Sequence, residues 1–299
     1  MPRAGTVALV GRPNAGKSTL MNRLLGEKVA IVSDKPQTTR HRLVGILSET
    51  RGQMVFYDTP GLHRPLHRLN RQMVRFAHDA LNSADAVCLL VDASQRFGSG
   101  DAFVLDLVSK AAGPKLVALN KTDLVSKPSL LPLIERYAGA GSFDEIVPIS
   151  ARTGDQCDVL LDLLWERLPE GEPIYDPELL TTHPERFLVA ERIREKVLEA
   201  TRGELPFTTA VVIDAWQEEP PDRLRIYASL LVERPGQKKI LIGKGGAMIK
   251  RLGTAARLDL EAFLGRSLYL DLKVREEPNW REDRRLLARM EQEPFGGAS

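Results

Sequence analysis

The stretch that decides the fold reads Gly11-Arg12-Pro13-Asn14-Ala15-Gly16-Lys17-Ser18. It matches the phosphate-binding pattern G-x-x-x-x-G-K-S/T and follows an apolar run at residues 6–10. The next residues, 19–25, are typical of a helix that ends at Gly26. In such a strand, loop and helix, glycines let the backbone wrap closely around phosphate, and the helix N-terminus adds partial positive charge. The sequence therefore predicts a P-loop nucleotide site.

Specific residues of this loop have expected roles at the phosphates. Lys17 should reach the β- and γ-phosphates, and Ser18 should ligate Mg²⁺. A second motif, at residues 58–61, follows an apolar run at 54–57. Its Asp58 suits an outer-sphere contact to Mg²⁺, and the Gly61 backbone N–H suits the γ-phosphate. The predicted phosphate-binding residues are Gly11, Asn14, Ala15, Gly16, Lys17, Ser18, Thr19 and Gly61.

A third motif, Asn120-Lys121-Thr122-Asp123, indicates which base is read. The Asp123 carboxylate can accept two hydrogen bonds from guanine N1 and its exocyclic amine, a donor pair that adenine lacks. The stem of Lys121 should cover the base, and Asn120 should tie this loop to the phosphate loop. Farther on, Ser150-Ala151 follows an apolar run and fits a loop that offers backbone N–H to guanine O6. The order of these elements predicts a guanine-nucleotide site.

Composition limits the class of protein. The chain has 299 residues, with 43% apolar and 27% charged residues, which fits one large or two ordinary soluble domains. Its longest strongly apolar run, residues 86–91, is too short to span a bilayer, which argues against a membrane transporter. The N-terminus lacks an apolar secretion segment, and the two cysteines have no metal-ligand spacing. We therefore predict a cytoplasmic protein, and the net charge of +2 means that any nucleic-acid surface is local.

Strand and helix patterns alternate in the first part of the chain. This predicts an α/β P-loop GTPase domain at residues 1–170, with a mostly parallel sheet and flanking helices. Strands are expected at residues 6–10, 43–47, 54–57, 86–91, 115–119 and 146–149, with the second and third forming a hairpin. Prolines punctuate residues 171–185, which are expected to be a linker. A second domain is expected at 186–275, followed by a tail at 276–299.

The second domain contains another glycine loop, Gly243-Lys244-Gly245-Gly246. The expected order of helix, strand, strand, helix, loop, helix and strand resembles the type II KH module, an α+β fold whose G-x-x-G loop clamps single-stranded RNA. Residues 234–257 hold several Lys and Arg and no Asp or Glu. A solvated basic turn would show the same charge, but the spacing favours RNA binding. The predicted RNA-binding residues are Lys238, Lys239, Ile242, Gly243, Lys244, Gly245, Gly246, Ile249, Lys250 and Arg251.

Together these strings resemble the Era family of bacterial ribosome-assembly GTPases over nearly the whole chain, residues 6–274. The resemblance rests on residues 11–18, 37–42, 58–61, 120–123 and 242–250. It implies binding of GTP and GDP with Mg²⁺, and binding near the 3′ end of small-subunit ribosomal RNA during maturation of the 30S subunit. It also implies peripheral association with the inner membrane. We expect a monomer.

The family pattern also assigns the switch residues. Thr38 or Thr39 should contact Mg²⁺ and the γ-phosphate, and the pattern favours Thr39. The predicted metal residues are thus Ser18, Thr39 and Asp58, and the catalytic or switch set is Lys17, Thr38, Thr39, Asp58, Gly61 and Asn14. The segment from Asp58 to about Arg75, with His63, Arg64 and His67, is expected to rearrange on hydrolysis.

Hydrolysis should be slow without assistance. The glutamine that orients water in Ras-like enzymes is replaced by Leu62, so we expect turnover on the order of 10⁻³ s⁻¹ or below. In related GTPases an asparagine at the position of Asn14 can hold K⁺ beside the phosphates. The alternative is that Asn14 only shapes the loop. Two other functions stay open: a GTPase that acts on another RNA, and an RNA chaperone whose nucleotide site is mainly structural.

Overall fold

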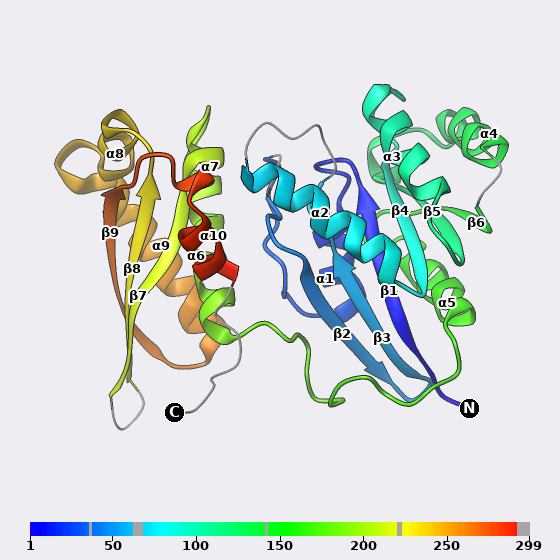
Figure 1. Cartoon of the computed structure of the whole chain (residues 1–299), viewed down its shortest axis with the longest axis horizontal. Helices are drawn as coiled ribbons and strands as arrows, with labels where there is room; N and C mark the ends of the chain where they lie inside the picture. The colour runs from blue at the N-terminus through cyan, green and yellow to red at the C-terminus, as the bar shows by residue number, and fades with distance from the viewer. Residues whose placement is uncertain (36–37, 62–67, 141–142, 220–222, 292–299) are drawn as a thin grey trace. The chain divides into compact units, whose positions relative to one another are not determined.

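The computed structural model of the chain describes residues 1–35, 38–61, 68–140, 143–219 and 223–291. The chain divides into two compact units, Met1–Thr182 and His183–Ser299 (Figure 1). Each unit has its own sheet and its own buried apolar core.

The first unit is built on a six-stranded sheet with the order β2-β3-β1-β4-β5-β6. β2 is antiparallel to β3 and forms the predicted hairpin with it, whereas the other neighbours are parallel. The strands are β1 (Arg3–Gly11), β2 (Leu43–Glu49), β3 (Gly52–Asp58), β4 (Ala86–Asp92), β5 (Lys115–Asn120) and β6 (Glu145–Pro148). Because β1, β3, β4, β5 and β6 run in one direction, their carboxyl ends meet at one edge, where such sheets bind ligands.

Helices connect these strands and cover the sheet. They are α1 (Lys17–Leu25), α2 (Arg68–Ser83), α3 (Ser99–Ser109), α4 (Leu131–Gly139) and α5 (Cys157–Arg167), with 3₁₀ turns η1 (Thr122–Leu124) and η2 (Lys127–Leu130). Figure 1 shows α2 in front of the sheet and α1 behind it. This three-layer arrangement holds the loops at the sheet edge in fixed positions.

One buried apolar cluster joins β1, β4 and β5 to α2, α3 and α4. Leu89 and Val91 of β4 belong to it, and the alternation of side chains along a strand places both on the same face of the sheet. Ala80 of α2, Val104 of α3 and Tyr137 of α4 complete the cluster from the helix side. This part of the core therefore lies between the sheet and the layer of α2, α3 and α4.

The stretch predicted as a linker is bound to the first unit at least as far as residue 180. The buried side chain of Gln53 accepts hydrogen bonds from the backbone N–H groups of Ile174 and Tyr175, both at 2.8 Å. It also donates to the Tyr175 carbonyl at 2.9 Å. Farther along, the Ile46 N–H donates to the Leu180 carbonyl at 2.8 Å. Residues 174–180 therefore lie along β2 and β3.

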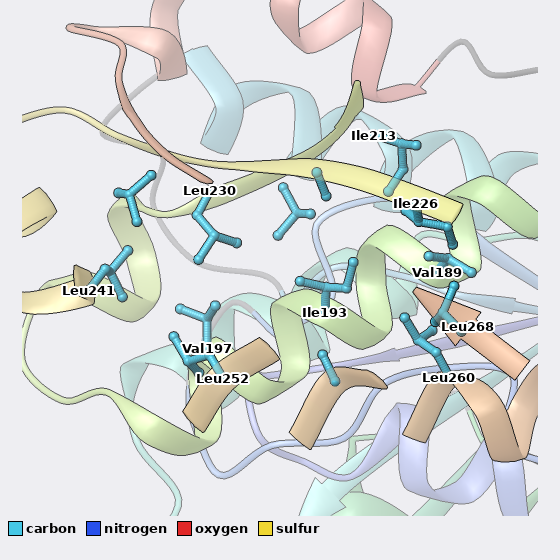
Figure 2. Packing of buried hydrophobic residues seen from close by; sticks show 14 of the residues in the cluster. Val189, Ile193, Val197, Ile213, Ile226, Leu230, Leu241, Leu252, Leu260 and Leu268 are labelled. Atoms are coloured by element: carbon cyan, nitrogen blue, oxygen red, sulfur yellow. The ribbon is translucent and has the colours of Figure 1, made fainter. Parts of the chain in front are cut away.

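The second unit has the element order that the sequence predicts, with one short helix, α7 (Leu205–Thr208), added before the first strand. It contains α6 (Glu185–Ala200), α7, β7 (Ala210–Glu219), β8 (Arg223–Val232), α8 (Pro235–Ile242), the 3₁₀ turn η3 (Lys244–Gly246), α9 (Ala247–Leu264) and β9 (Ser267–Glu276). The sheet order is β7-β8-β9, with β7 antiparallel and β9 parallel to β8. Figure 2 shows its core, where Ile193 and Val197 of α6 meet Leu252 of α9 and Leu230 of β8.

Residues after β9 pack onto this second unit. The 3₁₀ turn η4 (Trp280–Glu282) and helix α10 (Arg284–Glu291) follow the last strand. Trp280 is buried, and its ring N–H donates to the Thr208 carbonyl at 2.9 Å. Arg281 forms an ion pair with Glu233 at 2.5 Å. The sequence offered no motif here, because these contacts depend on residues far away in the chain.

Candidate functional site

The phosphate loop connects β1 to α1 at the carboxyl edge of the first sheet. Two of its residues have left-handed backbone, Asn14 with φ 63° and Gly16 with φ 97°. A Cβ on Gly16 would overlap the side-chain amide of Asn120, so glycine is required there by packing as well as by conformation. Asn14 donates to the Asp34 carbonyl at 2.7 Å, which places it beside the loop that precedes Thr38.

Lys17 is buried at the start of α1, with 5% of its surface exposed. Its ammonium donates to the carbonyls of Gly11 at 3.3 Å and Arg12 at 3.0 Å. Burial lowers the pKa of Lys17 to about 8, and the nearby carboxylate of Asp58 opposes part of that shift. A partly desolvated cation held by two carbonyls is suited to bind an anionic phosphate.

Three oxygen-bearing side chains meet beside this lysine. Ser18 Oγ lies 2.5 Å from Asp58 Oδ2 and 2.9 Å from Thr39 Oγ1. Thr39 Oγ1 lies 3.3 Å from the same Asp58 oxygen. The other oxygen, Asp58 Oδ1, is buried and has no hydrogen-bond partner among the described residues. Burial raises the pKa of Asp58, while Lys17 and the two hydroxyls oppose the shift.

This donor set fits a small, hard divalent cation. Mg²⁺ prefers oxygen ligands and binds through one or two protein groups plus substrate phosphates and water. The structure brings the predicted metal residues Ser18, Thr39 and Asp58 together at one point of the loop edge. A cation here would also satisfy the buried oxygen of Asp58.

A cavity of about 270 Å³ opens above these residues. Its walls include all the predicted phosphate residues except Gly11 and Ala15, both of which are buried in the loop backbone. Thr38, Thr39 and Lys121 also line it. The sequence did not single out four other lining residues, which come from the loop after α1: Ile31, Val32, Ser33 and Asp34. Leu62, His63, Arg64 and His67 lie outside the described residues.

The predicted guanine-reading loops are joined by Asn120. Its side chain donates to the Ala15 carbonyl at 2.8 Å and accepts from the Ala151 N–H at 2.9 Å. One buried amide therefore ties the phosphate loop to both base loops. The sequence predicts the bond to the phosphate loop, and the structure adds the bond to Ala151. The Ser150 hydroxyl donates to Asp123 at 2.7 Å, which leaves the second carboxylate oxygen near Arg152, at 3.5 Å.

Asp92 and Arg23, which the sequence did not indicate, hold the base loops in place. Lys121 has left-handed backbone, and its ammonium pairs with Asp92 at the end of β4, at 2.6 Å. Arg23 of α1 donates to the carbonyls of Ala151 at 3.3 Å and Arg152 at 2.6 Å. No local pattern could have identified Asp92 or Arg23, because both act across the sheet edge.

The second glycine loop lies between α8 and α9. Gly243 ends α8 with φ 74°, and Gly245 and Gly246 have φ of 58° and 81°. A Cβ on Gly243 would lie 2.8 Å from the Met248 backbone nitrogen, whereas Cβ atoms on Gly245 and Gly246 would meet nothing within 4 Å. Lys244 and Lys250 are exposed. The loop therefore presents open backbone and two cations to solvent.

A groove of about 300 Å³ follows this loop, between α9 and β9. Of the predicted RNA-binding residues, Ile249 and Lys250 line it, and the structure adds Gly253, Thr254, Arg257, Leu270 and Leu272. Lys239 and Arg251 are exposed and Lys238 is half-buried, all outside the groove lining. Ile242 packs against the core of the unit and is not among the groove residues. The floor is apolar and the rim basic, which suits stacked bases and a phosphate backbone.

The two units match two different family models. Residues 6–121 match the model described as a 50S ribosome-binding GTPase, and residues 204–281 match the KH domain model. The fold and the two sites therefore define a P-loop GTPase with a KH domain, a class of protein that binds a guanine nucleotide and contains an RNA-binding module.

Curated relatives narrow the class to one family. The chain is 47% identical to GTPase Era of Leuconostoc citreum over 282 residues, which cover 94% of this chain and 93% of the relative. It is also 47% identical to GTPase Era of Geobacter metallireducens over 287 residues, or 95% and 96% of the two chains. The chain belongs to the Era family of GTPases.

Solved structures agree with this assignment. A variant of Aquifex aeolicus Era bound to GDP and AlF₄⁻ has a TM-score of 0.93 and 38% identity, covering 96% of this chain and 98% of that one. A structure of Era with MgGDPNP and nucleotides 1506–1542 of 16S ribosomal RNA has a TM-score of 0.94 and 37% identity, covering 97% and 99%. Among the described residues, no helix is both long and apolar enough to cross a membrane.

Proposed function

We propose that the chain hydrolyses GTP in the first unit and uses the nucleotide state to control RNA binding by the second. The proposed RNA is single-stranded and lies near the 3′ end of small-subunit ribosomal RNA, and the proposed process is assembly of the 30S subunit. The observation that supports this most is the presence, in one chain, of a Mg²⁺-suited nucleotide cavity and an apolar groove beside a G-x-x-G loop. An Era relative binds MgGDPNP and nucleotides 1506–1542 of 16S ribosomal RNA.

At the phosphates, the proposed roles follow from the contacts described above. Lys17 binds the β- and γ-phosphates, and Thr38 and Gly61 contact the γ-phosphate. Ser18, Thr39 and Asp58 hold Mg²⁺ directly or through water, and the bound ion neutralises charge on the phosphate oxygens. The remaining phosphate contacts come from the backbone of the loop and from the start of α1.

At the base, Asp123 is proposed to read guanine. Its carboxylate already accepts one hydrogen bond from Ser150, so its orientation is fixed before nucleotide binds. The Ser150-Ala151 loop is proposed to offer a backbone N–H to guanine O6, and the Ala151 N–H would then exchange its present acceptor, Asn120 Oδ1, for the base. Lys121, held by Asp92, covers the base with its aliphatic stem.

At the RNA, the open backbone of Gly245 and Gly246 is proposed to receive phosphates, with Lys244 and Lys250 beside them. Bases then lie over the apolar floor formed by Ile249 and the residues of β9. Lys238, Lys239 and Arg251 add charge along the path of the RNA, and Gly243 sets the turn.

The rate of hydrolysis is proposed to depend on an added charge. Leu62 cannot orient water, and the contact of Asn14 with the Asp34 carbonyl places its amide at the mouth of the phosphate cavity. K⁺ held there would supply positive charge beside the phosphates. Turnover in KCl is expected to exceed turnover in NaCl at equal ionic strength, and Asn14→Ser should remove the difference. Equal turnover in the two salts would leave Asn14 with a role in loop shape only.

The function is tested by titrating a short RNA that matches the 3′ end of small-subunit ribosomal RNA. The titration is done at one fixed salt concentration with a non-hydrolysable GTP analogue and with GDP, because phosphate contacts alone give salt-dependent affinity. A scrambled RNA is the control. Sequence-selective binding that differs between the two nucleotides supports the proposal. Equal binding of both RNAs in both states argues for another RNA target, and absence of hydrolysis with RNA or 30S subunits argues for a structural nucleotide site.

Localisation in the cytoplasm with peripheral contact to the inner membrane is also part of the proposal. Flotation of the protein with vesicles of bacterial lipid composition would test the contact. Recovery with the vesicles at physiological salt supports it, and recovery only in the soluble fraction contradicts it.

A further inference from the structure

The side chain of Arg12 leaves the phosphate loop and is held by helix α3. Its guanidinium donates to Asp101 Oδ2 at 2.8 Å. The same carboxylate oxygen accepts the Gly98 N–H at 2.9 Å and so caps the start of α3. A Cβ on Gly100 would lie 2.8 Å from Arg12 Nε, so one side of the guanidinium packs against the first turn of α3, while 42% of the Arg12 side chain stays exposed. The pair therefore has a defined geometry, unlike two freely moving surface side chains.

The backbone carbonyl of Arg12, in contrast to its side chain, points toward the phosphate-binding lysine. This carbonyl accepts the Lys17 ammonium at 3.0 Å and the Ala15 N–H at 3.3 Å. One residue thus contacts α3 through its side chain and the phosphate-binding lysine through its carbonyl. A change in the position of Arg12 would move the acceptor that orients Lys17.

The loop on either side of Arg12 is fixed by tight packing. A Cβ on Gly11 would lie 2.5 Å from the Leu90 carbonyl, and a Cβ on Gly61 would lie 2.6 Å from Pro13 Cα. Val104 and Val108 anchor α3 in the buried core. Asp101 is therefore attached to a rigid part of the unit, and its bond to Arg12 restrains residues 12–14 from the side of α3.

We propose that Asp101, acting through Arg12, is a positioning residue for the nucleotide phosphates. It braces the loop so that Lys17 and the backbone N–H groups converge on the triphosphate. Neither residue belongs to the phosphate-binding set proposed above, and the inference rests on the GTP site proposed there. A purely superficial ion pair would contribute little, because solvent screens exposed charges.

The experiment is a double-mutant cycle with Arg12→Gln, Asp101→Asn and the double variant of the full chain. The substitution Asp101→Asn preserves the cap of α3, because the oxygen of the introduced amide can still accept the Gly98 N–H, and it removes the negative charge that holds the Arg12 guanidinium. Dissociation rates and affinities for fluorescent GDP and GTP, single-turnover hydrolysis and the thermal midpoint are measured.

The matched control is a second ion pair, at the end of the same helix. Lys110 pairs with Asp106 at 2.6 Å, outside the lining of the nucleotide cavity. Asp106→Asn and Lys110→Gln remove one negative and one positive charge, as the test variants do, without touching the phosphate loop. Any loss shared by test and control variants therefore reports charge or helix stability and not the position of the loop.

Each single variant is expected to weaken GDP and GTP binding about five- to tenfold, and the double variant no more than either, because residues in contact are coupled. The preference for guanine should not change. The thermal midpoints of the test variants should equal those of the control variants. Affinities within twofold of wild type, or losses that add up in the double variant, overturn the proposal. Wild-type protein is measured in parallel. If it also fails to bind GTP, the proposed GTP site is wrong; if it binds GTP, the variants test Asp101 and Arg12 alone.

Discussion

The chain has two glycine loops that are proposed to bind phosphate, and glycine is needed in them for different reasons. In the first loop, protein atoms occupy the place of a Cβ on Gly11 and on Gly16. In the second, Gly245 and Gly246 also have left-handed backbone, but the space around them is open. The first loop is therefore built into a cavity that the protein completes itself. In the second, only Gly243 has protein atoms at the place of its Cβ, and Gly245 and Gly246 are open to solvent.

The rest of the protein also holds the two loops in place in different ways. Asn120 and Asp101 attach the first loop to β5 and α3, which are distant in sequence. The second loop connects α8 directly to α9, and its support comes from those two helices. We therefore expect substitutions in the first loop to affect nucleotide binding most severely, and substitutions in the second to affect RNA binding alone.

The largest expected effect is that of Lys17→Ala. Removal of the ammonium takes away charged hydrogen bonds to phosphate, each worth about 1.5–3 kcal/mol, so GTP affinity should fall by roughly two orders of magnitude or more. The fold should persist, because the ammonium is a desolvated cation whose pKa is already lowered by burial. Isothermal titration and circular dichroism measure the two effects, with Lys110→Ala as the control. Normal GTP binding by Lys17→Ala would falsify the assignment of the phosphate loop.

Next in size is the effect of Asp123→Asn on base preference. An amide supplies one donor and one acceptor where the carboxylate supplies two acceptors, so GTP binding should weaken about tenfold or more, while xanthosine nucleotides should bind better. Competition of GTP, XTP and ATP against a fluorescent nucleotide measures the change. Asp106→Asn is the control for loss of charge. An unchanged order of preference would show that Asp123 does not read the base.

A smaller effect is expected in the second loop from Lys244→Asp. Lys244 is exposed, so reversal of its charge should leave the fold and nucleotide affinity unchanged while RNA affinity falls about tenfold. The dependence of RNA affinity on salt should also weaken, because a phosphate contact is lost. The control is Lys127→Asp, an exposed lysine of the first unit. Equal RNA affinity of both variants would place the RNA elsewhere than on the G-x-x-G loop.

The two loops also differ in how far the sequence alone could describe their surroundings. All the strands of the first sheet were predictable, because each is a short apolar run bounded by turn residues, and Asn120 was predictable from its motif. Arg23, Asp92 and Asp101 were not, because their partners come from other elements of the fold. In the second unit, Leu270 and Leu272 line the groove only because β9 pairs with β8 beside α9, a placement that no local pattern encodes.

The smallest expected effect is a dependence of the first loop on pH. The pKa of Lys17 is about 8 in the folded protein, below its ordinary value of 10.5. Between these two values the unfolded chain binds more protons than the folded one, so the nucleotide-free protein should become more stable as pH rises through this window. GTP binding should show the opposite trend, because a neutral amine cannot pair with phosphate. Affinity should fall about twofold between pH 7 and pH 8, where about half of the Lys17 ammonium loses its proton.

Lys17→Arg separates this effect from other titrations in the same range. The guanidinium stays charged, so binding by that variant should be weaker at neutral pH but should lose less affinity as pH rises. Guanine N1 also loses its proton in alkaline solution, and that loss acts on both proteins equally. The difference between their slopes therefore reports Lys17 alone. Identical slopes would mean that Lys17 keeps its proton in this range. The pKa of Lys17 would then lie above 8, because the carbonyls of Gly11 and Arg12 offset the effect of burial.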